Sequence, residues 1–267
     1  MTRSSPPTLE TLLVCKGHPY EREPFYAMFD AMADVNWTLV EQPAAQALFS
    51  IEQAAKFDAY VLYDMPGIQF DPNPGVAPHF FEPDADYVTR FEALVEDGFG
   101  FVFLHHAIAG WPAWPGYADL IGGRFLYMPG ELRGRSCVDS GYRHGVTHTV
   151  SVVHDHPVTR GVPSEFEITD ELYLYEVFED DVQPLLTSNH KFVHDNFFSA
   201  TLAVRDGKMF DNTGWHHDAG SNLIGWTREV GKSRIVYLQC GDDPVAYANE
   251  PFRQLVNNAI RWVAARD

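Results

Sequence analysis

Cysteine is scarce in this sequence, and its few copies are widely spaced. The 267 residues contain only Cys15, Cys137 and Cys240. An odd number of distant cysteines excludes a disulfide scaffold, and the lack of a CxxC pair excludes the common metal and redox motifs built on it. Cys15 and Cys240 fall in apolar segments, where buried thiols are usual. A cysteine nucleophile is therefore disfavoured.

Positive charge and long apolar runs are also lacking. The chain carries 19 Lys and Arg against 37 Asp and Glu, which gives a formal net charge of −18. Such a surface repels the phosphate backbone of DNA and RNA, so we expect no nucleic-acid partner. No run approaches the roughly 18 apolar residues of a membrane span, and residues 12–14 are too few for a signal-peptide core. We expect no membrane contact and a cytoplasmic location.

Several catalytic signatures are absent as well. The sequence contains no GxGxxG, GxxxxGK[ST], GxSxG or HExxH. The first two absences remove the support for dinucleotide and P-loop chemistry, so we expect no nucleotide cofactor. The third disfavours acyl transfer through an activated serine. General acid–base work by histidine and carboxylate, with or without a metal, remains open.

Aromatic residues and histidine are abundant instead. Aromatic residues make up 14% of the chain, and there are 12 histidines. Most of the rings belong in a core, but some can stack on the apolar side of a sugar ring, and others can form a homo-oligomer interface. We therefore expect a small-molecule partner, and the composition permits a homo-oligomer.

Strand and helix patterns alternate through the first 125 residues. Buried-strand patterns occur at residues 10–17, 37–40, 59–63 and 101–104, and helical spacing occurs at 20–34, 51–57 and 84–97. This alternation is typical of a doubly wound α/β sheet. Residues 68–83 have no periodicity and predict a long loop, and loops of that length are often functional.

The second half is richer in short strands. A partly antiparallel arrangement is predicted there, followed by a docked helix at 251–265 with one apolar face. We expect a single domain over residues 1–267. The expected strands are 149–153, 166–168, 172–177, 200–204, 223–226 and 234–238.

Candidate functional residues follow the predicted strands. In open α/β sheets ligands bind at the carboxyl ends of the strands. For each candidate a structural role is the alternative, and adjacent residues such as His105 and His106 point to opposite faces, so at most one faces a given pocket. His144 and His148 are expected in a solvated polar loop. The candidates are His18, Asp64, His105, His106, Asp170, Glu171, Trp215, His216, His217, Asp242 and Asp243.

Four ordered motifs resemble the ThuA-like (trehalose utilisation) family between about residues 10 and 263. The first is His105-His106-Ala107 with the later LIGGRF at 120–125. The others are HPVTRGVP at 156–163 with DELY at 170–173, GWTRE at 225–229 with GKSR at 231–234, and NAIRW at 258–262. The resemblance implies an α/β fold of the flavodoxin-like, class I glutamine amidotransferase-like type. This is a three-layer sandwich, here with an added strand-rich C-terminal half.

The resemblance also carries expectations about activity. Amidotransferases of this fold have a cysteine in the elbow after the central strand, whereas this chain has His105-His106, so no glutaminase activity is expected. The family is associated with disaccharide use, often beside oxidoreductases that make 3-keto sugars. A ketone at C3 acidifies the neighbouring C–H, so one base and one acid or metal could run isomerisation or elimination, and hydrolysis is a further option. Many members end a late strand with Gly-His where this chain has Gly241-Asp242.

These considerations lead to named roles. His105, Glu171 and Asp242 are the expected catalytic residues. A divalent transition metal such as zinc is expected on His18, His105 and His216, because histidine nitrogens suit it. A sugar or keto-sugar is expected against Asp64, Tyr173, Trp215 and His217. The alternative is a non-catalytic carbohydrate-binding or regulatory protein on an amidotransferase-like fold.

Overall fold

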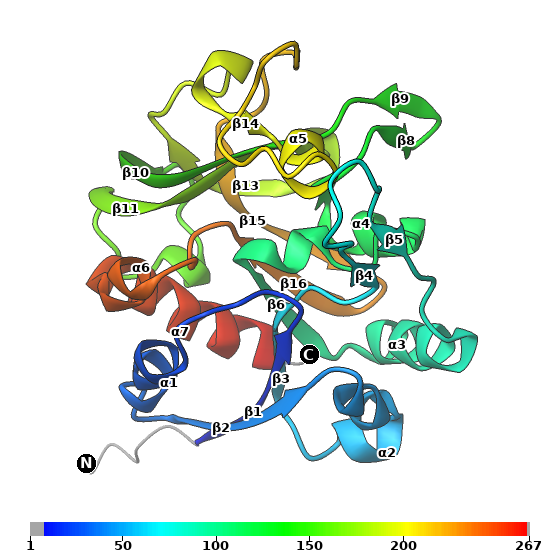
Figure 1. The fold of residues 1–267 in the computed structure, drawn as a ribbon. Helices are drawn as coiled ribbons and strands as arrows, with labels where there is room; N and C mark the ends of the chain where they lie inside the picture. Colours follow the sequence, from blue (N-terminus) through cyan, green and yellow to red (C-terminus); the bar gives the residue numbers. More distant parts are fainter. Residues whose placement is uncertain (1–7, 266–267) are drawn as a thin grey trace, which may run out of the picture.

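The computed structural model describes residues 8–265, and its central feature is one large mixed sheet (Figure 1). The strand order is β11-β10-β13-β15-β16-β6-β3-β1-β2, and β14 pairs with β10. Neighbours from β2 to β16 are parallel, and neighbours from β16 to β11 are antiparallel. The strands are β1 (Leu9–Lys16), β2 (Val35–Glu41), β3 (Ala59–Asp64), β6 (Gly100–Leu104), β10 (Gly141–Val152), β11 (Glu165–Leu174), β13 (Gln183–Ser188), β14 (Phe198–Ser199), β15 (Leu223–Val230) and β16 (Ser233–Leu238).

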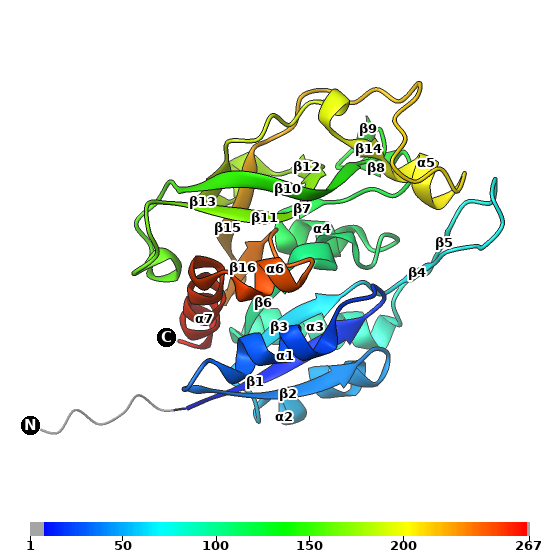
Figure 2. The same cartoon turned by 60° about the vertical axis from the view of Figure 1, so that its left-hand side comes forward.

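Helices cover both faces of the parallel half and make a three-layer α/β sandwich. α1 and α7 lie on one face, and α2 and α3 lie on the other (Figure 1). α5 lies over the antiparallel half, close to β14 (Figure 2). The helices are α1 (Arg22–Asp30), α2 (Ile51–Ala54), α3 (Ala85–Asp97), α4 (Pro115–Ile121), α5 (Ala200–Val204), α6 (Pro244–Ala248) and α7 (Glu250–Ala264).

Strand alternation divides the core into two clusters. Along β1, Leu13 packs in the cluster that contains Phe29 of α1 and Leu255 of α7. Its neighbour Leu12 packs in the other cluster, with Phe91 of α3. Successive side chains of a strand point to opposite faces, so a strand that is apolar throughout must be covered on both sides. This requirement places the five parallel strands in the middle layer.

Short elements fill the connections. β4 and β5 form a small hairpin in the loop expected at residues 68–83, and 3₁₀ turns follow several strands. Other two-stranded ladders join β7 to β12 and β8 to β9. These elements are β4 (Ile68–Gln69), β5 (His79–Phe80), β7 (Gly123–Arg124), β8 (Gly130–Leu132), β9 (Arg135–Cys137), β12 (Glu176–Val177), η1 (Ala44–Phe49), η2 (His105–Ala109), η3 (Pro157–Thr159), η4 (Glu179–Asp181) and η5 (His194–Asn196).

The predicted fold class is confirmed, and so is the alternation of strands and helices in the first half. One predicted strand is wrong: residues 200–204 form α5, because the Ser199 hydroxyl accepts the N–H of Leu202 and caps a helix there. The polar loop expected around His144 and His148 is also wrong, since both lie in the long strand β10. The single domain over 1–267 stays a prediction, and residues 1–7 and 266–267 lie outside the described part. Among residues 8–265, no helix is long and apolar enough to cross a bilayer.

The contact between β6 and α7 generates a stability prediction. A Cβ atom added to Gly100 would lie 2.1 Å from the carbonyl oxygen of Val263 in α7. We expect Gly100→Ala to lower the free energy of unfolding by about 1–3 kcal/mol, because overpacking forces the backbone to move. Urea denaturation followed by circular dichroism measures the change.

Gly130→Ala is the matched control, since its added Cβ would meet nothing closer than 3.9 Å. We expect this variant to stay within about 0.5 kcal/mol of the wild type. Equal stability of the two variants would contradict the prediction.

Candidate functional site

The site is built around a sharp turn at the end of β6. His105 follows the last residue of β6, opens η2 and has a φ of +47°. Residues with side chains rarely adopt this left-handed conformation, and it is held only where the surroundings over-determine it. The turn directs the fully buried His105 ring to the carboxyl edge of the parallel strands. We refer to this turn as the elbow.

Both nitrogens of His105 have partners. Nδ1 lies 2.6 Å from the carbonyl oxygen of Gln239, so its N–H donates there. Nε2 consequently faces the site, 3.1 Å from Oε2 of Glu171 and 3.3 Å from Oδ1 of Asp242. The hydroxyl of Tyr173 lies 2.7 Å from the same Nε2. The Gln239 carbonyl thus selects which nitrogen is presented to the two carboxylates.

A second histidine completes the cluster. His144 Nε2 lies 3.4 Å from Oε1 of Glu171, and its Nδ1 lies 3.5 Å from Oδ2 of Asp242. His105 is fully buried, whereas 42% of the His144 side chain is exposed. The two carboxylates therefore stand between an inner and an outer imidazole. We refer to His105, His144, Glu171 and Asp242 as the cluster.

A β-bulge brings His144 to this position. The register between β10 and β11 shifts, so that His144 and Gly145 together lie opposite Glu171. Gly145 has a φ of +64°, which a glycine adopts without strain. Bulges bend a strand and re-aim its side chains, and they are frequent beside active sites. The residues around His144 are polar, so the strand there was not predicted. The signal that could have found it is the two-residue spacing of Tyr142 and His144, because such residues share one face of a strand, and both line the pocket.

The electrostatics of the cluster are dominated by mutual pairing. Burial favours the neutral ring of His105, but hydrogen bonds and charge from Asp242 and Glu171 outweigh it and raise its pKa well above the usual value. Burial opposes ionisation of Asp242, yet hydrogen bonds from His105 and His144 hold its pKa well below the usual range. The hydrogen bond from Asp242 raises the pKa of His144. Both imidazoles are thus poised to hold protons beside the carboxylates.

Asp170 positions the backbone around the cluster. This buried carboxylate accepts backbone N–H groups from Gly241 at 2.6 Å and from Asp242 at 3.1 Å. Its Oδ1 also accepts the N–H of Glu171 at 2.8 Å. Burial raises the pKa of Asp170 to about 7, although the charge on His105 lowers it. One side chain therefore ties the Gly241-Asp242 turn to β11.

A pocket of about 410 Å³ opens above the cluster. Glu171, His144 and Tyr173 form part of its floor and wall. His18 also lines it, and the His18 ring stacks on His106 with centroids 4.5 Å apart. The remaining lining is Gly17, Pro19, Met65, Phe70, Asp71, Phe125, Tyr127, Tyr142, Ala200, Ala203, Val204 and Met209.

Four of the expected site residues lie elsewhere. Asp64 is buried and accepts a hydrogen bond of 2.7 Å from Gln42, and it does not line the pocket. His216, with 75% of its side chain exposed, faces His194 and Asp218. Trp215 donates to Asp139, and His217 contacts the backbone oxygen of Asp218. The loop at 215–217 is thus directed away from His105, because Trp215 packs into the core beside Gly141.

The cluster, in contrast, has the donor set of a cation site. Ligand atoms of His105, Glu171 and Asp242 lie within 4.8 Å of one another, and they are the one such group of three or more in residues 8–265. One nitrogen and two carboxylate oxygens suit zinc or another borderline divalent metal. The expected ligand set of His18, His105 and His216 stays a prediction. The structure places His216 beside His194 and Asp218, whereas it brings Glu171 and Asp242 to His105.

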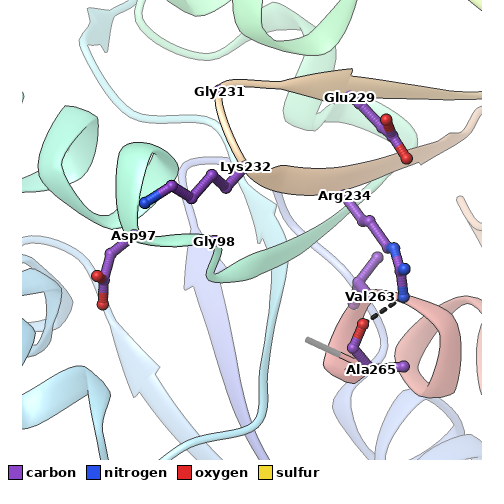
Figure 3. A pocket seen from close by; sticks show the side chains of 8 residues that line it. All are labelled: Asp97, Gly98, Glu229, Gly231, Lys232, Arg234, Val263 and Ala265. Atoms are coloured by element: carbon purple, nitrogen blue, oxygen red, sulfur yellow. Dashed lines mark hydrogen bonds between the residues drawn. The ribbon is translucent and has the colours of Figure 1, made fainter. Parts of the chain in front are cut away.

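A second cavity, of about 270 Å³, lies at the opposite edge of the sheet (Figure 3). Gly98 and Lys232, which line it, precede the first residues of β6 and β16. Arg234 spans it and donates to the backbone oxygen of Ala265. This cavity faces the amino ends of the parallel strands, where α/β sheets do not place their ligands. The pocket above His105 is therefore the candidate site.

Comparison with known proteins gives the family. A family model described as ThuA, trehalose utilisation, matches residues 22–263. The chain belongs to the ThuA family. No curated protein matches the sequence.

Solved structures agree with this fold. A protein described as ThuA-like from Bacteroides uniformis is 18% identical with a TM-score of 0.63, covering 98% of this chain and 94% of that one. Another described as ThuA-like, from Parabacteroides merdae, is 16% identical with a TM-score of 0.62, covering 97% and 90%. A protein described as a GMP synthase subunit, from Thermoplasma acidophilum, is 12% identical with a TM-score of 0.50, covering 96% and 94%. The fold is thus of the ThuA-like, glutamine amidotransferase-like type.

Asp64 generates a prediction about pH. Burial raises the pKa of Asp64 to about 7, well above the usual value of a carboxyl group, so the folded state holds this proton more tightly than the unfolded state. The contribution of protonated Asp64 to the free energy of unfolding is fully present below about pH 4. It is lost as the pH rises through about 7, and the loss amounts to up to about 4 kcal/mol. We expect Asp64→Asn, which keeps an acceptor for Gln42, to remove that loss.

Urea unfolding of the wild type and of Asp64→Asn between pH 5 and pH 8 measures the difference in their free energies of unfolding. Asp170, whose pKa is also raised, changes the stability of both proteins equally and cancels from this difference. The gap in stability should shift in favour of the variant as the pH rises. A gap that stays constant with pH would show that Asp64 is already ionised in the folded protein and that burial does not raise its pKa.

Proposed function

We propose that this protein is an enzyme of carbohydrate utilisation that acts on a sugar or 3-keto glycoside through His105, Glu171 and Asp242. Membership of a family described as trehalose utilisation supports the substrate class. The convergence of the three residues beneath one pocket is the observation that carries the proposal. A binding protein needs ring faces and hydrogen bonds, whereas a catalyst needs several titratable groups at one point.

β-Elimination from a 3-keto glycoside is the reaction that the cluster suits best. A carboxylate, Glu171, removes the acidified proton from C2, while the charge that develops on the ketone oxygen is stabilised by the Tyr173 hydroxyl, which lines the pocket and lies 2.7 Å from Nε2 of the buried His105 imidazolium. The C1–O bond then breaks as the C1=C2 double bond forms. His144, which lines the pocket as the outer imidazole, supplies the proton to the departing oxygen. Atoms and charges balance, since one proton leaves C2 and one joins the leaving group.

The same residues fit a divalent metal. The Nδ1–H of His105 is committed to the Gln239 carbonyl, so Nε2 can present a lone pair when a cation replaces its proton. His105, Glu171 and Asp242 would hold the ion, and a bound metal would supply Lewis acidity for the ketone oxygen.

Substitution of Glu171 tests the acid–base role. We expect Glu171→Gln to lower kcat/KM for a methyl 3-keto-glucoside by about 10²- to 10⁴-fold, because the amide cannot accept the C2 proton. Release of methanol in steady-state assays is the measurement. Glu167→Gln is the matched control, because Glu167 lies on the same strand and is exposed.

Unchanged turnover in Glu171→Gln would remove Glu171 from the mechanism. Saturable sugar binding by the wild type without any turnover would favour the carbohydrate-binding alternative.

Elemental analysis tests the metal. We expect purified, tag-free protein to carry about one equivalent of zinc or a similar ion, and His105→Ala to lose it, because the variant lacks the single nitrogen ligand. His216→Ala is the control and should keep its metal, since His216 faces His194 on the surface. Metal retained in His105→Ala, or no metal after reconstitution, would reject this part of the proposal.

A further inference from the structure

The pocket above the cluster has two unlike walls. One wall carries the titratable groups Glu171, His144 and His18, with Tyr173 beside them. The other wall, which we call the apolar wall, is formed by the small and apolar residues Ala200, Ala203 and Val204 of α5, together with Met209 and Phe70. The reacting atoms of the substrate must lie at the wall with the titratable groups. The leaving group attached to them therefore extends along the apolar wall.

A continuous path of aromatic rings leads from the cluster to the surface. The ring of Tyr173 stacks on His105 with centroids 4.8 Å apart, and Phe125 lies edge-on to Tyr173 at 4.8 Å. Tyr127 follows at 5.0 Å from Phe125, and Phe70 at 5.3 Å from Tyr127. Phe70 is 40% exposed, so the path ends at the pocket mouth. Edge-to-face ring pairs of this kind extend readily to one further ring.

The tyrosine hydroxyls that line the pocket already have hydrogen-bond partners. Tyr127 donates to the sulfur of Met65 at 3.0 Å. The Tyr142 hydroxyl accepts the N–H of Phe210 at 3.0 Å. Asp71, the polar side chain near the mouth, accepts from the backbone and side chain of Asn73. A second sugar ring would bury several hydroxyls here with few partners, and each unpaired buried hydroxyl is costly.

The pocket is held closed on this side by a contact between distant segments. The connection between β4 and β5 reaches α5, where the N–H of Gly75 donates to the backbone oxygen of Arg205 at 2.6 Å. Both segments lie at the same edge of the molecule (Figure 2). Phe70 and Met209, which flank this contact in the chain, form the outer lining. The apolar wall is therefore fixed in place on one side of a pocket of about 410 Å³, a volume typical of small-molecule sites.

We infer that the leaving group of the substrate is an apolar or aromatic aglycone, seated between α5 and the Phe125–Tyr127–Phe70 rings, and not a second sugar. This inference rests on the proposed function, because that function places the sugar ring at the cluster. It deepens the function by assigning the substrate class: aryl or alkyl glycosides in their 3-keto form.

Binding to a catalytically disabled protein tests the inference. We would titrate Glu171→Gln by calorimetry with phenyl 3-keto-glucoside, with methyl 3-keto-glucoside of the same anomer, and with 3-keto-trehalose. The phenyl compound should bind about tenfold or more tightly than the methyl compound, because burying a ring removes its apolar surface from water. The 3-keto-trehalose should bind no more tightly than the methyl compound.

Two variants made in the Glu171→Gln background locate the effect. Ala203→Trp fills the space in front of α5 and should abolish the preference for the phenyl compound over the methyl compound. Met209→Ser, at an exposed position, should reduce the same preference without disturbing the core. Val245→Trp is the control, because Val245 is exposed on α6 and does not line the pocket.

Equal affinity for the phenyl and methyl compounds, tighter binding of 3-keto-trehalose, or a preference that survives both variants would overturn the inference. Turnover that depends on Glu171 but shows no aryl preference would reject this inference and keep the proposed function. An aryl preference in binding, without turnover by the wild type, would reject the proposed function and keep the assignment of the apolar wall.

Discussion

The pairing of the buried His105 ring with two carboxylates is the interaction on which the candidate site depends. A buried charge is tolerated only when it is paired and hydrogen-bonded, so Glu171 and Asp242 require His105 as much as it requires them. The pairing needs the left-handed elbow to aim the ring and the Gln239 carbonyl to orient it. Removing any partner would leave an uncompensated charge in the interior.

The sheet explains how residues so distant in sequence meet. The elbow and the turn after β16 lie side by side because β6 and β16 are parallel neighbours. Glu171 and His144 come from the antiparallel pair β10 and β11, where a bulge re-aims one side chain. Asp170 joins the two groups by binding the backbone of Gly241 and Asp242. The added antiparallel half thus supplies part of the site as well as extending the sheet.

Much of the fold and part of the site could be predicted from the sequence. Apolar strands with alternating helices indicated the parallel sheet, and the binding of ligands at the carboxyl ends of strands indicated His105 and Asp242. Glu171 was expected between two strands, but it lies inside the antiparallel strand β11, and the structure brings all three residues together. His144 was missed because the polar residues around it conceal the strand, and the register shift of the bulge cannot be predicted from the spacing of residues. His216 was misplaced because a loop with tryptophan and two histidines looks functional, whereas packing of Trp215 decides its direction. Short apolar runs such as residues 200–204 fit helix and strand alike until a cap is seen.

The acidic residue at position 242 sets the charge balance of the cluster. The resemblance to the family implies Gly-His at this place, whereas this chain has Gly241-Asp242, and the structure sets that carboxylate against both imidazoles. A histidine there would leave Glu171 as the single anion among three imidazoles. With Asp242, two anions face two imidazoles, so the cluster is neutral when both rings are protonated, or when a divalent cation stands beside two neutral rings. Asp242 therefore balances the charge of two protonated rings, and under the proposed function it would do the same for a bound cation.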